Sequence, residues 1–343
     1  MKRRARRLIA QAVSSLVLGL VCLQFGGSPV RADTDANPVV IRYLNDRGYV
    51  PPYEIAEALG FFRGTGIRFE SEGDSQGGPQ ALAALASGSV DVAGAATPAM
   101  INAIAGGAKI ICIMPRAGVS KDVTSKFFVL DSNPVKAATD VKDKSIAVNT
   151  LGAHLDYTVR EYLRLHGLNK DDVKLVAVPG PQLDQTLRDQ KADVVAVGAW
   201  QSPIAAKIAA EGSVRVLFTD YDVLGDIVQA SNAMQTAFID QHPQAVKEFV
   251  TASAKAVDWA AEHPDEARKL VAQILKKRGD DPGAAAAAYW PGYGIAQHAL
   301  YTDHDTKFWL DVLVREGKLK PGQLSPEDIA TNKYNANASP AAH

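Results

Sequence analysis

Residues 87–114 of this 343-residue chain read SGSVDVAGAATPAMINAIAGGAKIICIM, and this stretch decides the fold class. The apolar run 90–93 predicts a short buried strand, and residues 98–105 have helical spacing between Pro98 and two glycines. Residues 109–114 predict another strand. A strand, one helix and a further strand are typical of a parallel βαβ unit, so we predict an α/β fold.

The same alternation extends outward in both directions. Further strands are predicted at 39–44, 67–72, 127–130, 145–148, 173–178, 194–197 and 214–218. Helices are predicted between them at 52–59, 79–87, 154–166, 181–190 and 203–210, and in a C-terminal layer at 244–262, 264–277, 282–289 and 305–315. The alternation restarts after a turn at 131–134, which indicates two α/β lobes, each a mainly parallel sheet flanked by helices. We predict a discontinuous first lobe (38–127 plus 230–334), a second lobe (128–229) and a disordered tail (335–343).

Composition supports an ordinary globular chain. Apolar residues make up 47% and charged residues 22%, with 37 basic and 38 acidic side chains. These values exclude a disordered chain, a collagen-like chain and a disulfide-stapled miniprotein. The length exceeds the roughly 250–300 residues at which single cores stop growing, which again favours two domains.

Residues 1–32 predict an export signal. They carry six basic residues and no acidic one, then an apolar stretch at about 13–25, and end in Val30-Arg31-Ala32. We therefore expect cleavage after Ala32 and a periplasmic protein, with Sec and twin-arginine export both open. The remaining 311 residues carry a net charge of −7, so we expect no general attraction to nucleic acid. Cys112, the one cysteine outside this segment, is expected to be a buried core thiol.

One local pattern recurs in both predicted lobes. A strand ends, a few small or polar residues follow, and a proline opens the next helix, as at Pro52, Pro79, Pro98, Pro181 and Pro203. The first N–H groups of a helix lack helical partners, and the helix dipole makes that end positive. Several such ends at the carboxyl edge of a parallel sheet would form an anion site.

A family resemblance adds to this interpretation. The strings EALGFF (57–62), GPQAL (78–82), SGSVDV (87–92), TPA (97–99), AGGA (105–108), GAH (152–154) and HP (242–243) occur in a familiar order and spacing. Over residues 38–325 the chain resembles the periplasmic binding proteins of nitrate, sulfonate and taurine ABC importers. The resemblance implies a type II two-lobed fold, with ligand held in a cleft that closes on it, and a monomer that docks on an ABC permease of the inner membrane.

Carried over position by position, the resemblance implies a set of ligand-binding residues and no catalytic residue, cofactor or metal. These ligand contacts are Asn45, Tyr49, Gln76, Gly77, Gly78, Thr97, Pro98, Gly152, Ala153, His154, Trp200 and Gln201. Relatives often read Trp-Asp-Pro where this chain has Trp200-Gln201-Ser202-Pro203, which disfavours a zwitterion such as taurine. We expect a small anion such as an organic sulfonate, nitrate or an aromatic carboxylate. A heteroaromatic compound like a thiamine precursor is the alternative.

Other functions are open at this stage. Residues 73–77 match G-x-S-x-G, and a serine hydrolase would use Ser75 as its nucleophile, but no oxyanion-type glycine loop precedes it. The spacing of His298 and His304 does not suit a metal site on one helical face. Arg47 and Arg116 follow strand ends and could meet an anion, although such arginines are more often solvated surface charges. A clamshell that presents its ligand to a receptor is a further non-enzymatic alternative.

Overall fold

The computed structural model describes residues 38–75 and 77–338. The predicted export signal, Gln76 and residues 339–343 of the predicted tail lie outside the described residues. Asn335, at the start of that predicted tail, is buried, and its Nδ2 donates to His298 O at 2.7 Å. None of the helices in the described part is long and apolar enough to cross a membrane.

The first α/β half contains two small sheets. In one, β1 (Val39–Asp46) pairs in parallel with β2 (Ile67–Ser75). In the other, β10 (Ile227–Gln235) lies antiparallel between β3 (Val92–Ala96) and β4 (Ile110–Val119). Asp91 N, just before β3, donates to Arg42 O in β1 at 2.9 Å, which links the two sheets. Helices α1 (Pro52–Ala58), α2 (Gly78–Ser87) and α3 (Thr97–Ala105) connect these strands.

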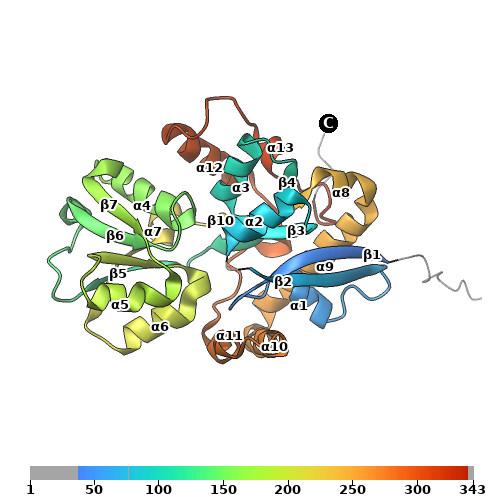
Figure 1. Ribbon diagram of the computed structural model, residues 1–343, viewed down its shortest axis with the longest axis horizontal. Helices are drawn as coiled ribbons and strands as arrows, with labels where there is room; N and C mark the ends of the chain where they lie inside the picture. The colour runs from blue at the N-terminus through green and yellow to red at the C-terminus, as the bar shows by residue number, and fades with distance from the viewer. Residues whose placement is uncertain (1–37, 76, 339–343) are drawn as a thin grey trace, which may run out of the picture. The chain divides into compact units, whose positions relative to one another are not determined.

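The second α/β half has a single sheet of order β7-β6-β8-β5-β9. Figure 1 labels three of its strands, β5, β6 and β7. The strands are β5 (Lys126–Leu130), β6 (Lys144–Val148), β7 (Val173–Ala177), β8 (Val194–Val197) and β9 (Val214–Thr219). Only β5 is antiparallel to its neighbours. The helices are α4 (His154–Leu165), α5 (Leu183–Arg188), α6 (Ser202–Ala210) and α7 (Asp220–Leu224). In each half one antiparallel strand lies between two strands that are parallel to each other: β10 between β3 and β4, and β5 between β8 and β9.

The C-terminal segment supplies helices to the first half. They are α8 (Thr236–Gln241), α9 (Pro243–Glu262), α10 (Pro264–Lys277), α11 (Asp281–Ala286), α12 (Asp303–Arg315) and α13 (Pro326–Ile329). Single 3₁₀ turns occur at η1 (Ala138–Val141), η2 (Lys170–Asp172), η3 (Gly180–Gln182), η4 (Ala199–Gln201), η5 (Ala287–Tyr289) and η6 (Gln297–Ala299).

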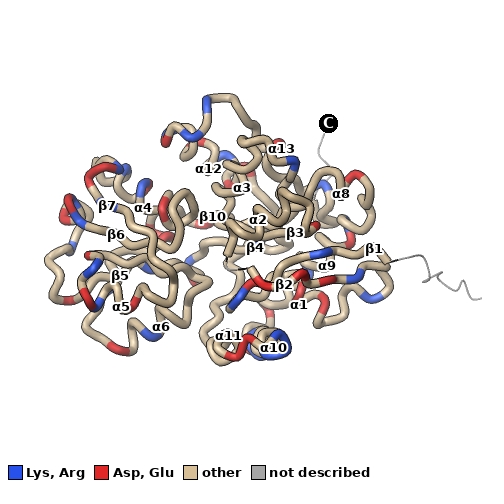
Figure 2. Tube along the Cα trace, in the orientation of Figure 1, with Lys and Arg blue, Asp and Glu red and all other residues tan. Residues whose placement is uncertain are grey.

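Apolar periodicity explains how these helices pack. Phe249 and its neighbours on α9 join a core with Ile41, Tyr53 and Met234, whereas Trp309 of α12 lies in a second core with Met100. Each side chain is at most 2% exposed. Basic and acidic residues are interspersed along both halves, as expected for a solvated surface (Figure 2).

The structure differs from the predicted elements mainly at β10, which the sequence pattern did not predict. Its residues IVQASNAMQ include Gln, Ser and Asn, which are poor strand formers, and small alanines. The strand forms because it is buried between two partners, which satisfy its backbone groups on both sides. The helix predicted at 181–190 is instead the turn η3 followed by α5.

Candidate functional site

The loop after β1 is built on a buried ion pair. Arg116, near the end of β4, reaches across to Asp46 at the end of β1 and forms an ion pair through Nη2. Its Cζ lies 4.4 Å from the ring centroid of Tyr49, and the Tyr49 hydroxyl donates to Arg116 O at 2.9 Å. The guanidinium rests on Gly94 of β3, where a Cβ would come within 1.9 Å of Nη1. Gly94 is thus required for this close approach.

The prediction that Arg116 is a solvated surface charge is wrong. The residue is 7% exposed, and its Nη1 has no hydrogen-bond partner among the described residues. Burial is the largest single effect and lowers the pKa of Arg116, but Asp46, Tyr49 and Tyr53 together outweigh it, so the net pKa lies above the ordinary value. Arg116 therefore stays charged inside the first half, where its charge is balanced by Asp46.

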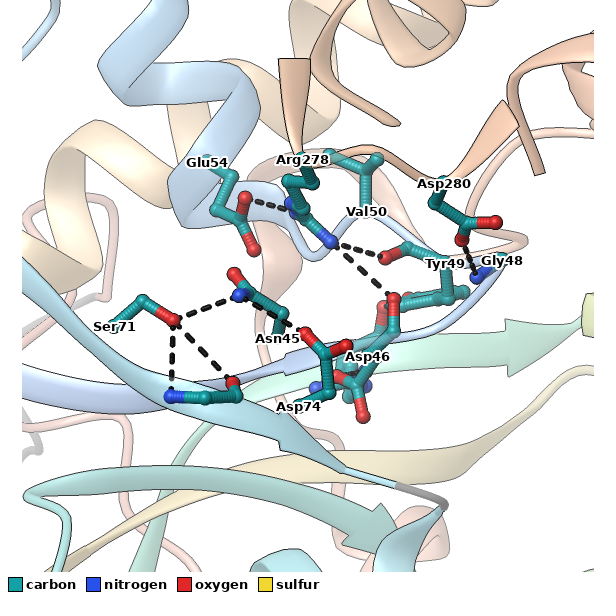
Figure 3. Close-up of polar contacts among 12 residues, drawn as sticks. Asn45, Asp46, Gly48, Tyr49, Val50, Glu54, Ser71, Asp74, Arg278 and Asp280 are labelled. Carbon is teal, nitrogen blue, oxygen red and sulfur yellow. Dashed lines mark hydrogen bonds and ion pairs between the residues drawn. The ribbon is translucent and has the colours of Figure 1, made fainter. Parts of the chain in front are cut away.

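A second buried pair fixes the same loop from the C-terminal side (Figure 3). Arg278, just after α10, pairs with Glu54 of α1 and donates from Nη1 to Asp46 O at 3.3 Å and Tyr49 O at 3.2 Å. Asp280 Oδ2 accepts from Gly48 N at 2.7 Å. These contacts attach the short loop between β1 and α1 to the segment that follows α10.

Asn45 lies beside this loop but contacts β2. Its Nδ2 donates to Ser71 Oγ at 2.7 Å and to Asp74 Oδ1 at 3.3 Å, as Figure 3 shows. Arg47 also pairs with Asp74, at 3.0 Å, and is exposed as predicted for a solvated charge. Of the two predicted contacts in this loop, Tyr49 faces Arg116 and Asn45 faces the edge of β2.

The predicted contacts at the starts of α2 and α3 lie at strand ends. Gly77 has a φ of 145°, a region that favours glycine, and Gly78 is so close to β3 that a Cβ would lie 3.1 Å from Ala95 Cβ. Thr97 is 1% exposed, with its hydroxyl 3.1 Å from Ser231 Oγ of β10. Pro98 is buried in the first turn of α3, and neither helix has a hydrogen bond from an N-cap side chain.

The predicted contacts at the start of α4 are Gly152, Ala153 and His154. Gly152 has a φ of 73°, and its N–H donates to Asp156 Oδ2 at 2.7 Å. Ala153 is the extended N-cap residue. His154 is 1% exposed, and its Nε2 lies 2.9 Å from Asp220 Oδ2, whereas its Nδ1 has no partner among the described residues.

Trp200 and Gln201 fold back on their own loop. The Trp200 ring covers Gly198, where a Cβ would lie 2.5 Å from Cη2, and it packs against the core of the second half. Gln201 Oε1 accepts from Gly198 N at 3.0 Å. Among residues that the sequence reasoning missed, Asp46 and Asp220 could have been found, since each is an acid that follows an apolar strand.

Two residues bear on an enzymatic function. Ser75 is 2% exposed, and its Oγ donates to Gly77 O at 2.8 Å and accepts from Gly77 N at 3.0 Å. No histidine is among these partners, so the Ser–His pair of a hydrolase is not formed in the part of the chain that the structure describes. Cys112 is fully buried as predicted, and burial raises the pKa of its thiol to about 12.

Two cavities of about 390 and 380 Å³ lie elsewhere in the fold. The first is lined by residues around Thr236 and Tyr334. The second is lined by the loop around Tyr293 and by the two chain crossings, which are the segments 120–125 and 225–226 through which the chain passes from one half to the other. Neither is lined by a predicted ligand contact. Within residues 38–75 and 77–338, no group of three or more His, Cys, Asp or Glu side chains could hold a metal ion.

Comparison with known proteins identifies the fold and a family. A family model described as NMT1/THI5 like matches residues 48–267. The periplasmic aliphatic sulphonate binding protein SsuA from Escherichia coli is 17% identical, with a TM-score of 0.67 over 86% of this chain and 92% of that one. The desulfurization enzyme DSZB is 16% identical, with a TM-score of 0.62 over 87% of this chain and 98% of that one.

A Candida albicans gene product described as having the generic periplasmic binding protein fold is 16% identical, with a TM-score of 0.60 over 83% of this chain and 92% of that one. At these identities the likeness shows the fold alone, which is the predicted two-lobed α/β fold of periplasmic binding proteins. No curated protein sequence matches this chain.

Proposed function

Because this chain belongs to the NMT1/THI5-like family, we propose that it is an exported solute-binding protein of an ABC importer. In this proposal the protein captures a small anion between its two halves and delivers it to a permease in the inner membrane. The E. coli structure of similar fold is described as a sulphonate-binding protein, which supports an organic sulfonate as one candidate solute.

The arrangement of four helix N-termini carries this proposal. Helices α2, α3, α4 and α6 follow strands β2, β3, β6 and β8, and none has a hydrogen bond from its N-cap side chain. First-turn backbone N–H groups that lack a helical acceptor can bind an anion, and two of these helices come from each half. In α2 and α6 part of this capacity is used, because Gln80 N donates to Gly77 O and Ser202 N donates to Ala199 O. Small residues such as Gly77 and Gly152 precede three of the four helices and allow a solute to approach the backbone.

We propose capture by closure of the two halves. The solute binds first to one half and then gains contacts from the other, which shifts the population from open to closed forms. Tyr49 and Trp200 supply aromatic surface on opposite halves and would cover an apolar or aromatic part of the solute. A heteroaromatic solute would use the same two rings, so the solute panel below includes it.

Binding is favoured over catalysis by the two candidate nucleophiles. The Ser75 hydroxyl is held by the backbone of Gly77, and the Cys112 thiol is buried with a raised pKa. The enzyme DSZB has the same fold, so the fold itself does not decide between the two functions. The binding proposal is supported by the burial of both side chains, since a nucleophile must be accessible to its substrate.

The test is a thermal-shift screen of the protein purified after export. The panel contains ethanesulfonate, taurine, nitrate, benzoate and a thiamine pyrimidine precursor. A solute at about 100 times its dissociation constant should add about 2.7 kcal/mol of stability and raise the Tm by a few degrees. We expect one class to give this shift, with the shift lost in Trp200→Ala and kept in the matched control Tyr289→Ala, an exposed aromatic outside the predicted contacts.

The opposite result is equally clear. If no solute in the panel shifts the Tm, and the protein instead hydrolyses an ester in a reaction that disappears in Ser75→Ala, the binding proposal is wrong. The ester assay is also run on the wild type, so that a thermal-shift screen without a hit is not by itself counted against solute binding.

A further inference from the structure

Helix α4 connects the two halves independently of the chain crossings. One face of α4 buries Leu155, Val159 and Leu163 in the core of the second half. Tyr157, on another face, lies in a core of the first half together with Trp309 of α12. A single helix therefore takes part in the packed interior of both halves.

Ion pairs extend this contact along α4 to the end of α12. Arg160 Nη1 lies 2.8 Å from Glu316 Oε2, and Arg315 Nη2 lies 2.9 Å from Glu161 Oε2. Lys170 adds a longer contact of 3.7 Å to Glu316. The side chains of Glu161 and Glu316 are only 7% and 16% exposed, so salt screens these pairs less than it screens surface pairs.

The other end of α12 is fixed to the first half. Trp309 Nε1 donates to Val228 O at 2.8 Å, and Asp305 Oδ1 accepts from Val228 N at 2.7 Å. Val228 belongs to β10, directly after the second chain crossing. Helix α12 therefore contacts strand β10 of the first half and, through its ion pairs, helix α4 of the second half.

The contact between α4 and α12 lies next to the loop before α4, which contains predicted solute contacts. His154 opens α4, and the centroid of its ring lies 5.7 Å from that of Trp309 in an edge-on arrangement. Gly152 and Ala153 precede it directly. A displacement of α4 relative to α12 would therefore move this loop relative to the first half.

We propose that the α4–α12 contact is the pivot on which the two halves close, and that Arg160, Glu161, Arg315 and Glu316 are positioning residues that set solute affinity without touching the solute. The affinity part of this inference rests on the proposed solute binding, and the pivot rests on the proposed movement of the two halves, which can be measured without solute. A fixed pivot holds the loop before α4 in place before solute binds. The entropic cost of ordering this loop on binding is therefore smaller.

The experiment uses Glu161→Gln/Glu316→Gln, which keeps side-chain shape and removes both charges. The matched control is Asp184→Asn, because Asp184 forms pairs of similar length with Arg188 and Lys207 inside the second half. The first readout is the distance distribution between spin labels at Ser87→Cys and Lys191→Cys, two exposed sites on opposite halves. It needs no solute, and Cys112 is buried and does not compete for label.

We expect a broader distance distribution in the double glutamine variant and an unchanged one in Asp184→Asn. With ethanesulfonate as probe, we expect the variant to bind about fivefold or more weakly, a typical coupling between sites. Raising the salt concentration should weaken probe binding by the wild type only slightly, because the pairs are partly buried and salt screens them less than surface pairs.

Three results would overturn the pivot: identical distributions in wild type and double variant, equal broadening in Asp184→Asn, or tighter probe binding in the double variant. If the wild type does not bind ethanesulfonate, the distance measurement alone still decides the pivot, and only the proposed solute class fails.

Discussion

Glu54 makes protein stability depend on pH in an unusual direction. Its carboxyl is 5% exposed beneath the loop after β1, and its Oε1 has no partner among the described residues. Burial raises its pKa from an ordinary 4.5 to about 7, despite the opposing effect of Arg278. In the unfolded chain the same carboxyl ionises near its ordinary value.

The sign follows from which state holds the proton. Between pH 4.5 and 7 the folded protein keeps a proton on Glu54 that the unfolded chain has lost. Folding therefore takes up a proton, and the free energy of unfolding falls as pH rises through this window. A gap of roughly 2.5 pH units, at about 1.4 kcal/mol per unit, corresponds to a loss of about 3 kcal/mol.

The assay is urea unfolding of the wild type and Glu54→Gln at several pH values between 4 and 8. Other titrating groups cancel in the difference between the two proteins, so the difference should change by about 3 kcal/mol, mostly between pH 4.5 and 7. Glu72→Gln, at an exposed position on β2, serves as control and should follow the wild type. A difference that stays constant across the range would refute the reasoning.

Three further predictions concern buried groups. Asp46→Asn should lower the free energy of unfolding in urea by about 3–5 kcal/mol, because it leaves Arg116 buried without a countercharge. The double variant Asp46→Leu/Arg116→Met should recover most of this lost stability. A double variant that loses as much stability as the two single variants added together would contradict this prediction. Because its thiol is buried and has a raised pKa, Cys112 should react with a disulfide reagent at pH 8 only after the protein unfolds. Rapid reaction of the folded protein would show that the thiol is accessible. Gly294→Ala should lower the Tm by several degrees, since a Cβ would lie 2.6 Å from Gly118 O at a φ of 62°; an unchanged Tm would show that the loop yields.

The sequence predicted most strands and helices because their apolar runs are bounded by glycine and proline. Residues 194–197 and 214–218, for example, are strands β8 and β9 within one residue. Strand β10 was missed because its stability comes from its position between β3 and β4 and not from its own residues. Tertiary pairing of this kind leaves little local signal in a single sequence.

The candidate site was predicted less completely than the fold. Sequence spacing located the loops, and the structure places Gly77, Thr97 and Gly152 at strand-to-helix junctions. It could not show that Arg116 crosses the sheet to Asp46, because these residues are 70 positions apart and their pairing depends on strand order. The sequence also could not show that His154 is buried and hydrogen-bonded to Asp220.

The central position of β10 also sets the order in which the protein can be completed. All five strands of the second half come from one continuous stretch, from Lys126 to Thr219. Strands β3 and β4 of the first half must instead wait for β10, which begins at Ile227. As the chain emerges from the ribosome or a translocation channel N-terminus first, roughly a hundred residues follow β4 before its partner arrives. The half that begins first is therefore finished last, and its unpaired strand edges are the surface that a holding chaperone would need to cover in the meantime.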